Sequence, residues 1–234
     1  TTPRTKSYFI PTKTVTNEVW QKPQIDIRAP HFNGQRFFNP WEREDRNQAA
    51  LFKWILTRQS QTWPRWCQNQ QFSLPPARYS ESLNAWKVWF VGHATLLLQI
   101  GPYNFLTDPV WGERCSPFKN AGPKRVRAAG IALEDLPPID AVLLSHNHYD
   151  HLDTASLLWL HEHHQMPIVT GLGNGVYLRQ YGMNVVELDW WQSHSFAEGV
   201  DIHYLPAKHF SGRGVRDRNA ALWGGLSVVT PHGH

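Results

Sequence analysis

Cysteine is scarce in this chain, because only Cys67 and Cys115 occur among 234 residues. Two isolated cysteines make neither a disulfide framework nor a zinc finger, so we expect both to be free thiols. No apolar run approaches the roughly 18 residues of a membrane-spanning helix, and no apolar core of a signal peptide follows the first residues. We therefore expect no transmembrane segment, and a location in the cytoplasm or at a membrane surface.

Two common catalytic signatures are also missing. The sequence has no G-x-S-x-G elbow and no glycine-rich phosphate loop, which disfavours a serine nucleophile and a P-loop enzyme. Charged residues make up only 18% of the chain, and the net charge of +4 identifies no partner. Lys and Arg are scattered over the whole length, whereas a nucleic-acid-binding module needs a concentrated basic face. We therefore expect no nucleic-acid partner.

Aromatic residues, by contrast, are abundant, at 13% of the chain with 12 Trp. Proline recurs through residues 1–80 and breaks most regular elements there. The exception is the segment 43–60, where apolar residues recur at helical spacing. The sequence therefore predicts an N-terminal extension, residues 1–80, that contains one helix, wraps the core and packs onto it through aromatic side chains.

Short apolar runs dominate from Trp86 onward. The first three predict an antiparallel meander, and a polar loop follows over residues 109–130. Strands and helices then alternate, with Asp153 as the N-cap of a helix, which predicts an α/β fold with helices outside a sheet. The expected strands cover residues 86–92, 94–100, 103–108, 139–146, 166–170, 184–190, 200–207 and 221–230, and the expected short helices cover residues 133–136 and 173–182.

A dense group of ligand-type side chains follows the apolar run AVLL: residues 145–153 read SHNHYDHLD. Residues two apart at a strand end point to the same side, so His146 and His148 converge on one cation. Asp150 and His151 come in the next turn and face a second point nearby. Imidazole suits zinc, iron or manganese, and an adjacent carboxylate favours a hydrolytic site over a structural one. The motif H-x-H-x-D-H therefore predicts half of a two-metal site.

Other histidines carry a different expectation. Near the end of the predicted helix, cationic side chains suit the helix dipole, so we expect three histidines to lie at the surface: His161, His163 and His164. His232 and His234 form a second H-x-H, within Pro-His-Gly-His. We interpret that stretch as a hairpin turn rather than as a pair of ligands.

The motif after the buried strand resembles the signature of the metallo-β-lactamase superfamily. Flanking segments are similar in more detail to the N-acylphosphatidylethanolamine-hydrolysing phospholipase D family and its bacterial relatives, over roughly residues 30 to 230. These segments are HFNGQRFFNPWE (31–42), VWFVGHATLLLQI (88–100), FLTDPVW (105–111), SPFKNAGPKRVR (116–127), LPPIDAVLLSHNHYDHLD (136–153) and LPAKHFSGR (205–213). The resemblance implies an αββα sandwich, with residues 81–234 as the N-terminal portion of its catalytic domain.

The resemblance also implies two metal ions, expected to be zinc, with manganese or iron as alternatives. His146, His148 and His209 would bind the first ion. Asp150 and His151 would bind the second ion and act as the catalytic residues, which hold a hydroxide shared by both metals. The family's bridging aspartate and last histidine would follow residue 230 in register, and neither is in the sequence. We therefore expect the sequence to be truncated at its C-terminus.

Three further residues match positions of the family. Tyr149 occupies the place of a tyrosine that meets the substrate head group. Asp108, in LTDP, and His93, in VGHAT, would support the ligands from behind rather than bind the metals themselves.

The resemblance implies a zinc-dependent phosphodiesterase of the phospholipase D type, which acts on N-acylated phospholipids. The expected partners are the phospholipid substrate and a peripheral membrane contact, and a homodimer is a further option. A sugar-phosphate lactonase, or another hydrolase of this fold, is the first alternative. An inactive membrane-associated protein is the second.

Overall fold

The computed structural model describes residues 29–41, 48–59, 62–69, 74–118 and 120–233. None of the helices in this part of the chain has the length and apolar character needed to cross a membrane. The elements, in chain order, are α1 (Gln48–Thr57), β1 (Trp86–Gly92), β2 (Thr95–Ile100), β3 (Tyr103–Thr107), the 3₁₀-helix η1 (Leu133–Asp135), β4 (Ala141–Leu144), α2 (Thr154–His164), β5 (Ile168–Gly171), α3 (Asn174–Arg179), β6 (Val185–Leu188), β7 (Ser193–Ala197), β8 (Val200–Leu205) and β9 (Gly225–Val229).

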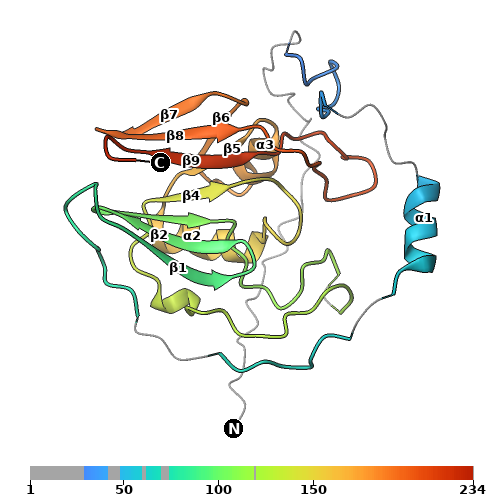
Figure 1. Cartoon of the computed structure of the whole chain (residues 1–234), viewed down its shortest axis with the longest axis horizontal. Coiled ribbons are helices and arrows are strands. Elements are labelled where there is room, and N and C mark those ends of the chain that lie inside the picture. The colour runs from blue at the N-terminus through green and yellow to red at the C-terminus, as the bar shows by residue number, and fades with distance from the viewer. Residues whose placement is uncertain (1–28, 42–47, 60–61, 70–73, 119, 234) are drawn as a thin grey trace.

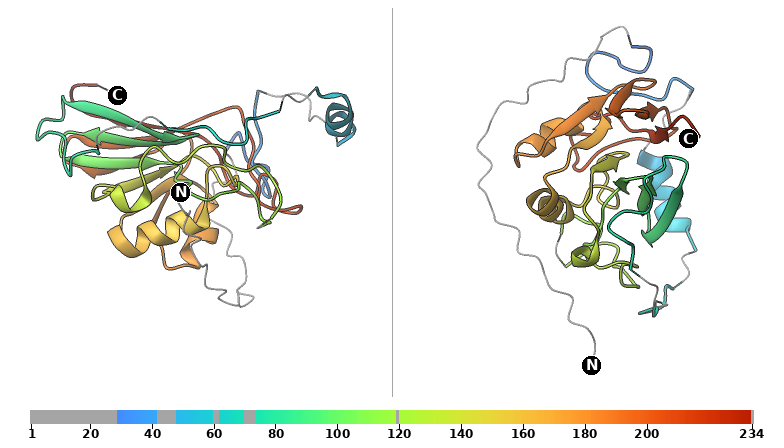
Figure 2. Two further views of the ribbon diagram at one scale, coloured as in Figure 1. Left: turned by 90° about the horizontal axis from the view of Figure 1, so that it is seen from below. Right: turned by 90° about the vertical axis from the view of Figure 1, so that its left-hand side faces the viewer.

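Two sheets form the body of the protein. The larger sheet has the strand order β1-β2-β3-β4-β5-β6, antiparallel from β1 to β3 and parallel from β3 to β6. The smaller sheet, β7-β8-β9, is antiparallel. Figures 1 and 2 show the smaller sheet stacked against one face of the larger sheet, with α2 on the opposite side. The described chain therefore has a helical layer followed by two sheet layers.

Strand β4 lies in the middle of these layers, and all four of its residues are buried. Ala141 and Leu143 pack into the core between the two sheets, whereas Val142 and Leu144 pack into the core beneath α2. Burial on both faces explains why this strand is a continuous apolar run without polar alternation. The chain leaves β4 at its carboxyl end, the edge of a parallel sheet where ligand sites commonly form.

The start of α2 is fixed by Asp153, which confirms the predicted N-cap. Its carboxylate accepts hydrogen bonds from the N–H of Ala155 (3.3 Å) and the hydroxyl of Ser156 (2.6 Å). It also accepts one from the N–H of Gly112, at 2.9 Å, in the polar loop that follows β3. The metal-type motif therefore occupies a short connection between a buried strand and a capped helix.

Several boundaries differ from the prediction. Strand β7, residues Ser193–Ala197, was not predicted, because its sequence SHSFA is mostly polar. The only local sign of this β7–β8 hairpin is the Glu-Gly turn before β8. The last strand begins at Gly225 rather than at residue 221. Leu222 and Trp223 are buried outside the sheet, where Leu222 N–H donates to Leu172 O and the Trp223 indole donates to Ala207 O.

The N-terminal extension is only partly described. Within it, Phe37 is buried against the core between the sheets, as expected of an aromatic anchor. In and after α1, however, Phe52, Trp54 and Trp63 are exposed, so the expected aromatic packing does not extend to them. The domain boundary at residue 80 stays a prediction. Cys67 and Cys115 are free and partly buried.

Candidate metal centre

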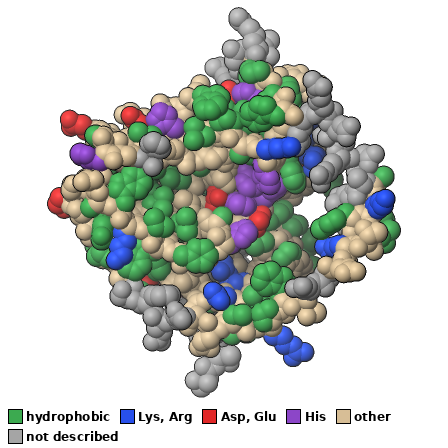
Figure 3. Space-filling view, viewed as in Figure 1, with side chains coloured by type: hydrophobic (Ala, Val, Ile, Leu, Met, Phe, Trp, Pro, Cys, Tyr) green, Lys and Arg blue, Asp and Glu red, His purple; other side chains and the backbone are tan. Residues whose placement is uncertain are grey.

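The predicted ligands come together at the carboxyl end of β4. His146, His148, Asp150 and His151 lie on the connection between β4 and α2, and His209 lies between β8 and β9. Figure 3 shows histidine side chains gathered near the middle of one face, with acidic side chains beside them. Together with His93, these five residues form two groups of three donor atoms in the described part of the chain.

The first group contains His146, His148 and His209. The Nε2 atom of His146 lies 2.9 Å from Nδ1 of His148, and Nε2 of His209 lies 3.1 and 3.2 Å from those two atoms. A tetrahedral zinc ion with Zn–N bonds of about 2.0–2.1 Å needs nitrogen atoms roughly 3.3–3.4 Å apart. The three nitrogens therefore already have nearly the spacing that one cation requires.

Burial keeps this first group neutral. Desolvation, followed by the charges of neighbouring histidines, lowers the pKa of His146 to about 2. Desolvation and His209 lower the pKa of His148 to about 4, and desolvation also lowers the pKa of His209. Neutral imidazole is the form that binds metals, so these three side chains are ready to coordinate at neutral pH.

Ser145 fixes the tautomer of His146. The Ser145 hydroxyl donates its one proton to Asp108 Oδ2, at 2.7 Å. Its contact of 2.9 Å with Nδ1 of His146 must therefore be one in which the imidazole donates. The proton then resides on Nδ1, and the lone pair of Nε2 faces the other two histidines.

The second group contains His93, Asp150 and His151. Oδ2 of Asp150 lies 3.0 Å from Nε2 of His93 and 3.6 Å from Nε2 of His151. Burial raises the pKa of Asp150, but His151 and His93 outweigh it and lower the pKa overall. Burial likewise lowers the pKa of His151, but its hydrogen bond with Asp108 outweighs that effect and raises it. An ionised carboxylate thus lies between two imidazoles.

His93 lies closer to this group than the sequence suggested. It belongs to the tight turn between β1 and β2, and its φ of 53° is in the left-handed region, which is uncommon for a residue other than glycine. With this backbone conformation, Nε2 of His93 faces Oδ2 of Asp150 rather than supporting a ligand from behind. His93 is therefore a candidate donor for the second cation, in place of the supporting role expected for it.

Asp108, at the end of β3, supports both groups from behind. Its Oδ1 accepts from the N–H of Ser145 (2.7 Å), and its Oδ2 accepts from the Ser145 hydroxyl and from Nδ1 of His151 (2.8 Å). One carboxylate therefore orients His151 directly and His146 through Ser145. This is the supporting position that the sequence predicted for Asp108.

Tyr149 lies against Arg213. Its hydroxyl donates to the carbonyl oxygen of Arg213, at 2.9 Å, and the Arg213 guanidinium lies 4.1 Å from the centre of the Tyr149 ring. The hydroxyl of Tyr149 is therefore already engaged in a tertiary contact. Contact between Tyr149 and a substrate stays a prediction. Sequence reasoning missed Arg213, since no local pattern distinguishes it from the other arginines.

Arg213 fixes the loop that carries the ligands. Its guanidinium donates to the carbonyl oxygens of Asn147 (2.9 Å) and Leu152 (2.8 Å), on either side of the H-x-D-H turn. It also lies against the rings of Tyr149 and Tyr177. Both hydrogen bonds come from one terminal nitrogen of a planar guanidinium that also lies against two rings, and the point charge of lysine does not combine these contacts.

We expect Arg213→Met to lower the free energy of unfolding by about 2–3 kcal/mol, because two partly buried carbonyls lose their donor and two cation–π contacts disappear. Arg213→Lys should recover less than half of this loss. Urea unfolding of the metal-free protein measures both effects. Arg216→Met, at an exposed position of the same loop, is the control. Equal stability of Arg213→Met and Arg216→Met would contradict the assigned role.

We also expect the metal-free protein to lose stability as the pH falls. The folded-state pKa of His146 is about 2, below its ordinary value of 6.5, so the unfolded chain binds more protons at any pH between these values. The contribution of His146 to the free energy of unfolding is therefore fully present above pH 6.5. It decreases below that pH, by about 3 kcal/mol at pH 4.5. Urea unfolding in EDTA at pH 7.5 and 4.5 measures the decrease. His146→Gln should reduce it, and an unchanged decrease in that variant would refute the attribution.

Of the three histidines predicted to lie at the surface, only one is fully exposed. His161 is partly buried, and its buried Nδ1 has no hydrogen-bond partner among the described residues, which corrects the prediction for it. His163 is exposed and stacks on Trp159. His164, however, is half-buried, and its Nδ1 accepts a hydrogen bond from the N–H of Ile139 (3.3 Å), which corrects the surface position predicted for it. His232 is exposed and lies in the predicted turn, closed by hydrogen bonds between Thr230 and Gly233. His234 lies outside the described residues.

Comparison with known proteins agrees with this geometry. The model of a family described as "Beta-lactamase superfamily domain" matches residues 103–234, more than half of the chain. An uncharacterized protein of Mycobacterium bovis is 44% identical over 147 residues, which are 62% of this chain and 39% of that protein. N-acyl-phosphatidylethanolamine-hydrolyzing phospholipase D 1 of Caenorhabditis elegans is 37% identical over 150 residues, which are 60% of this chain and 42% of that protein. The chain thus spans well under two thirds of the length of both relatives.

Among solved structures, an isothiocyanate hydrolase from Delia radicum gut bacteria aligns with a TM-score of 0.46 and 26% identity, covering 61% of this chain and 58% of that one. The family match, together with the helix–sheet–sheet layering, confirms the α/β fold of the metallo-β-lactamase type. The match over residues 103–234 shows that the chain belongs to the metallo-β-lactamase superfamily.

Proposed function

We propose that this chain forms the centre of a zinc-dependent hydrolase that binds two divalent cations and cleaves a phosphodiester of N-acylated phospholipids. The observation that carries the proposal is the pair of donor groups on one short connection. His146, His148 and His209 converge to within 3.2 Å, and Asp150 and His151 form the second group with His93. Similarity to N-acyl-phosphatidylethanolamine-hydrolyzing phospholipase D 1 supports the choice of substrate.

The residues divide the chemical work between them. Bound in the two groups, divalent cations would supply a water of lowered pKa and neutralise charge on a phosphate oxygen. The neutral imidazoles of His146, His148 and His209 would hold one cation without a net charge of their own. Asp150, an ionised carboxylate, would offset part of the charge of the second cation and accept a hydrogen bond from a water beside it. Asp108 would keep the ring of His151 in the tautomer that presents Nε2.

A separate surface supports access to a lipid. The segment 62–69 lies along the basic stretch 124–127, where Cys67 N–H donates to Val126 O at 2.6 Å. Trp63 and Trp66 are exposed on this segment, at 80% and 52%. Aromatic rings interleaved with basic side chains suit the interface of a membrane with anionic lipids. Peripheral contact with a membrane is therefore part of the proposal.

The decisive experiment combines metal analysis with two substrates. Purified protein, loaded with zinc and then freed of excess metal, should retain about two equivalents and hydrolyse an N-acylated phosphatidylethanolamine in mixed micelles. EDTA should abolish the activity, and zinc should restore it. Metal-dependent hydrolysis of a phosphorylated lactone alone would instead establish the lactonase alternative. Two bound equivalents without turnover of either substrate would refute the enzymatic proposal.

A further inference from the structure

A segment far away in the sequence lies against the chain that carries His209. We call residues 29–41 the strap and residues 206–224 the His209 loop. Phe37 of the strap is buried, and its N–H donates to Asn219 O at 2.9 Å. The Arg36 guanidinium donates to the carbonyl oxygens of Arg216, at 2.8 Å, and of Arg218. Buried apolar contact and main-chain hydrogen bonds together fix the strap on the His209 loop.

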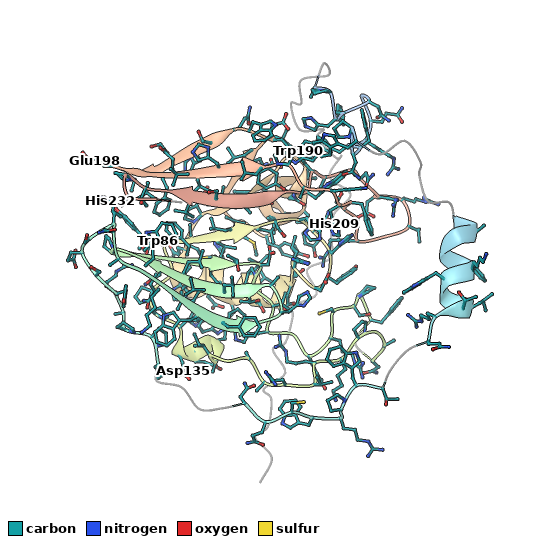
Figure 4. The ribbon with its side chains drawn as sticks, viewed as in Figure 1. Trp86, Asp135, Trp190, Glu198, His209 and His232 are labelled. Atoms are coloured by element: carbon teal, nitrogen blue, oxygen red, sulfur yellow. The ribbon has the colours of Figure 1, made fainter. Side chains whose placement is uncertain are left out.

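The strap also contacts the residues that follow β6 of the larger sheet. Nε2 of His31 donates to Oδ1 of Asp189 at 2.7 Å, and the His31 ring stacks on Trp190, whose ring also stacks with Trp41. In Figure 4, the labelled Trp190 and His209 both lie at the end of the sheets nearest to the strap. The strap therefore has a fixed position relative to the larger sheet, and it can transmit that position to the loop that it touches.

Asn39 of the strap contacts the main chain of His209 with both ends of its carboxamide. Its Nδ2 donates to His209 O at 2.7 Å, and its Oδ1 accepts from the N–H of His209 at 3.3 Å. Among side chains, only the carboxamides of Asn and Gln present a neutral donor and an acceptor side by side in this way. The contact therefore specifies the direction of the main chain at His209, and not merely its distance.

His209 needs such a contact more than the other two histidines of its group do. Strand β8 ends at Leu205 and β9 begins at Gly225, so no strand ladder fixes the main chain at His209. His146 and His148, in contrast, directly follow the buried strand β4, and Arg213 holds the carbonyl of the residue between them. A small rotation of the main chain at His209 would move its Nε2 away from the spacing that a cation requires.

We propose that Asn39 is a positioning residue for the first metal group: its carboxamide sets the main chain of His209 and thereby the affinity for the first cation. The inference rests on the proposed metal centre and adds a role for the N-terminal extension. Partners that orient a metal ligand typically change metal affinity by about 10- to 100-fold when they are removed. Asn39 acts on the main chain rather than on the imidazole, so we expect the lower end of this range.

The test compares Asn39→Ala with Asn33→Ala. Asn33 lies in the same strap, and the hydrogen bonds that its side chain accepts come from the N–H groups of Gln35 and Arg36, within the strap itself. Competition with a chromophoric chelator should show that Asn39→Ala lowers the affinity for zinc about 10-fold, whereas Asn33→Ala leaves it within twofold. The absorption of bound Co²⁺ should change in the Asn39 variant only. Equal affinities in the two variants would overturn the inference.

A cycle with His209→Ala separates positioning from a general loss of structure. In the His209→Ala background, Asn39→Ala should not lower zinc affinity further, because the ligand that it positions is gone. A second 10-fold loss in that background would show that Asn39 acts through overall stability, against the inference. Asn39→Asp should behave like Asn39→Ala, since a carboxylate cannot donate to His209 O. If His209→Ala itself left zinc binding unchanged, the proposed metal centre would fail instead.

Discussion

Replacing His148 or Asp150 with alanine is expected to lower kcat/KM for the proposed phosphodiester substrate at least about 1000-fold, which corresponds to about 4 kcal/mol of transition-state stabilisation. Each substitution removes one donor from a group of three, and a divalent cation contributes several kcal/mol to such a reaction. The two residues belong to different groups, so each variant should retain about one equivalent of zinc. Kinetics together with metal analysis checks both expectations.

Both variants should remain folded. The carboxylate of Asp150 is 42% exposed, and His148 is only partly buried and lies outside both apolar cores, so neither truncation opens a cavity in the core. Thermal unfolding in EDTA should therefore occur within a few degrees of the parent protein. His163→Ala is the matched control, because His163 is an exposed histidine on α2 that stacks on Trp159 and hydrogen-bonds to its carbonyl oxygen, away from the donor groups. Full turnover in either ligand variant, with the control also active, would disprove the assignment of that ligand.

The metal-type motif could be predicted from the sequence because its parts are local. Four donors between His146 and His151 need only a strand end and one turn to converge, and the apolar run AVLL indicates both the strand and its burial. His209 is different, since nothing near it in the sequence shows which loop it belongs to, and only the family resemblance placed it. Its position depends on tertiary contacts such as the one with Asn39.

Other features depended on tertiary structure that local patterns do not encode. His93 reaches the second group because a left-handed turn between β1 and β2 redirects its side chain, and a single histidine in VGHAT does not indicate that turn. Strand β7 is polar and was missed, because it pairs with β8 without burying a full apolar face. The aromatic residues of α1 show the converse error, since abundance of Trp and Phe predicted packing that Phe52 and Trp54 do not have.

Asp108→Asn is expected to reduce zinc affinity at least about 100-fold while it changes the stability of the metal-free protein by less than about 2 kcal/mol. Asparagine has nearly the shape of aspartate and tolerates the left-handed φ of 33° found at this residue. Its Oδ1 can still accept from the N–H of Ser145, which leaves the NH₂ group facing the Ser145 hydroxyl and Nδ1 of His151. Both contacts must then reverse their direction.

This reversal reaches both donor groups. In the variant, the Ser145 hydroxyl would accept from the new carboxamide and donate to Nδ1 of His146, so the proton of His146 would move to Nε2, inside the first group. His151 would likewise accept at Nδ1 and carry its proton on Nε2, next to Asp150. Two nitrogens that face the cations would lose their lone pairs, although no ligand has been removed. Chelator competition measures the loss of affinity, and Asp140→Asn is the control, because Asp140 pairs with Arg78 at the amino end of β4, away from the donor groups.

Asp108→Ala should lose stability rather than zinc affinity, and the contrast with Asp108→Asn tests whether Asp108 controls the tautomers. Alanine leaves the Ser145 N–H and the His151 N–H without acceptors in a buried site and adds a strained left-handed backbone, which together should cost about 3–5 kcal/mol of stability. It does not force either imidazole into the wrong tautomer, so zinc should still bind to the folded fraction more tightly than to Asp108→Asn. If Asp108→Asn bound zinc as the parent protein does, the carboxylate would not control the tautomers of His146 and His151. Asp108 would then contribute only to packing, and the neutral imidazoles alone would account for the preformed spacing of the first group.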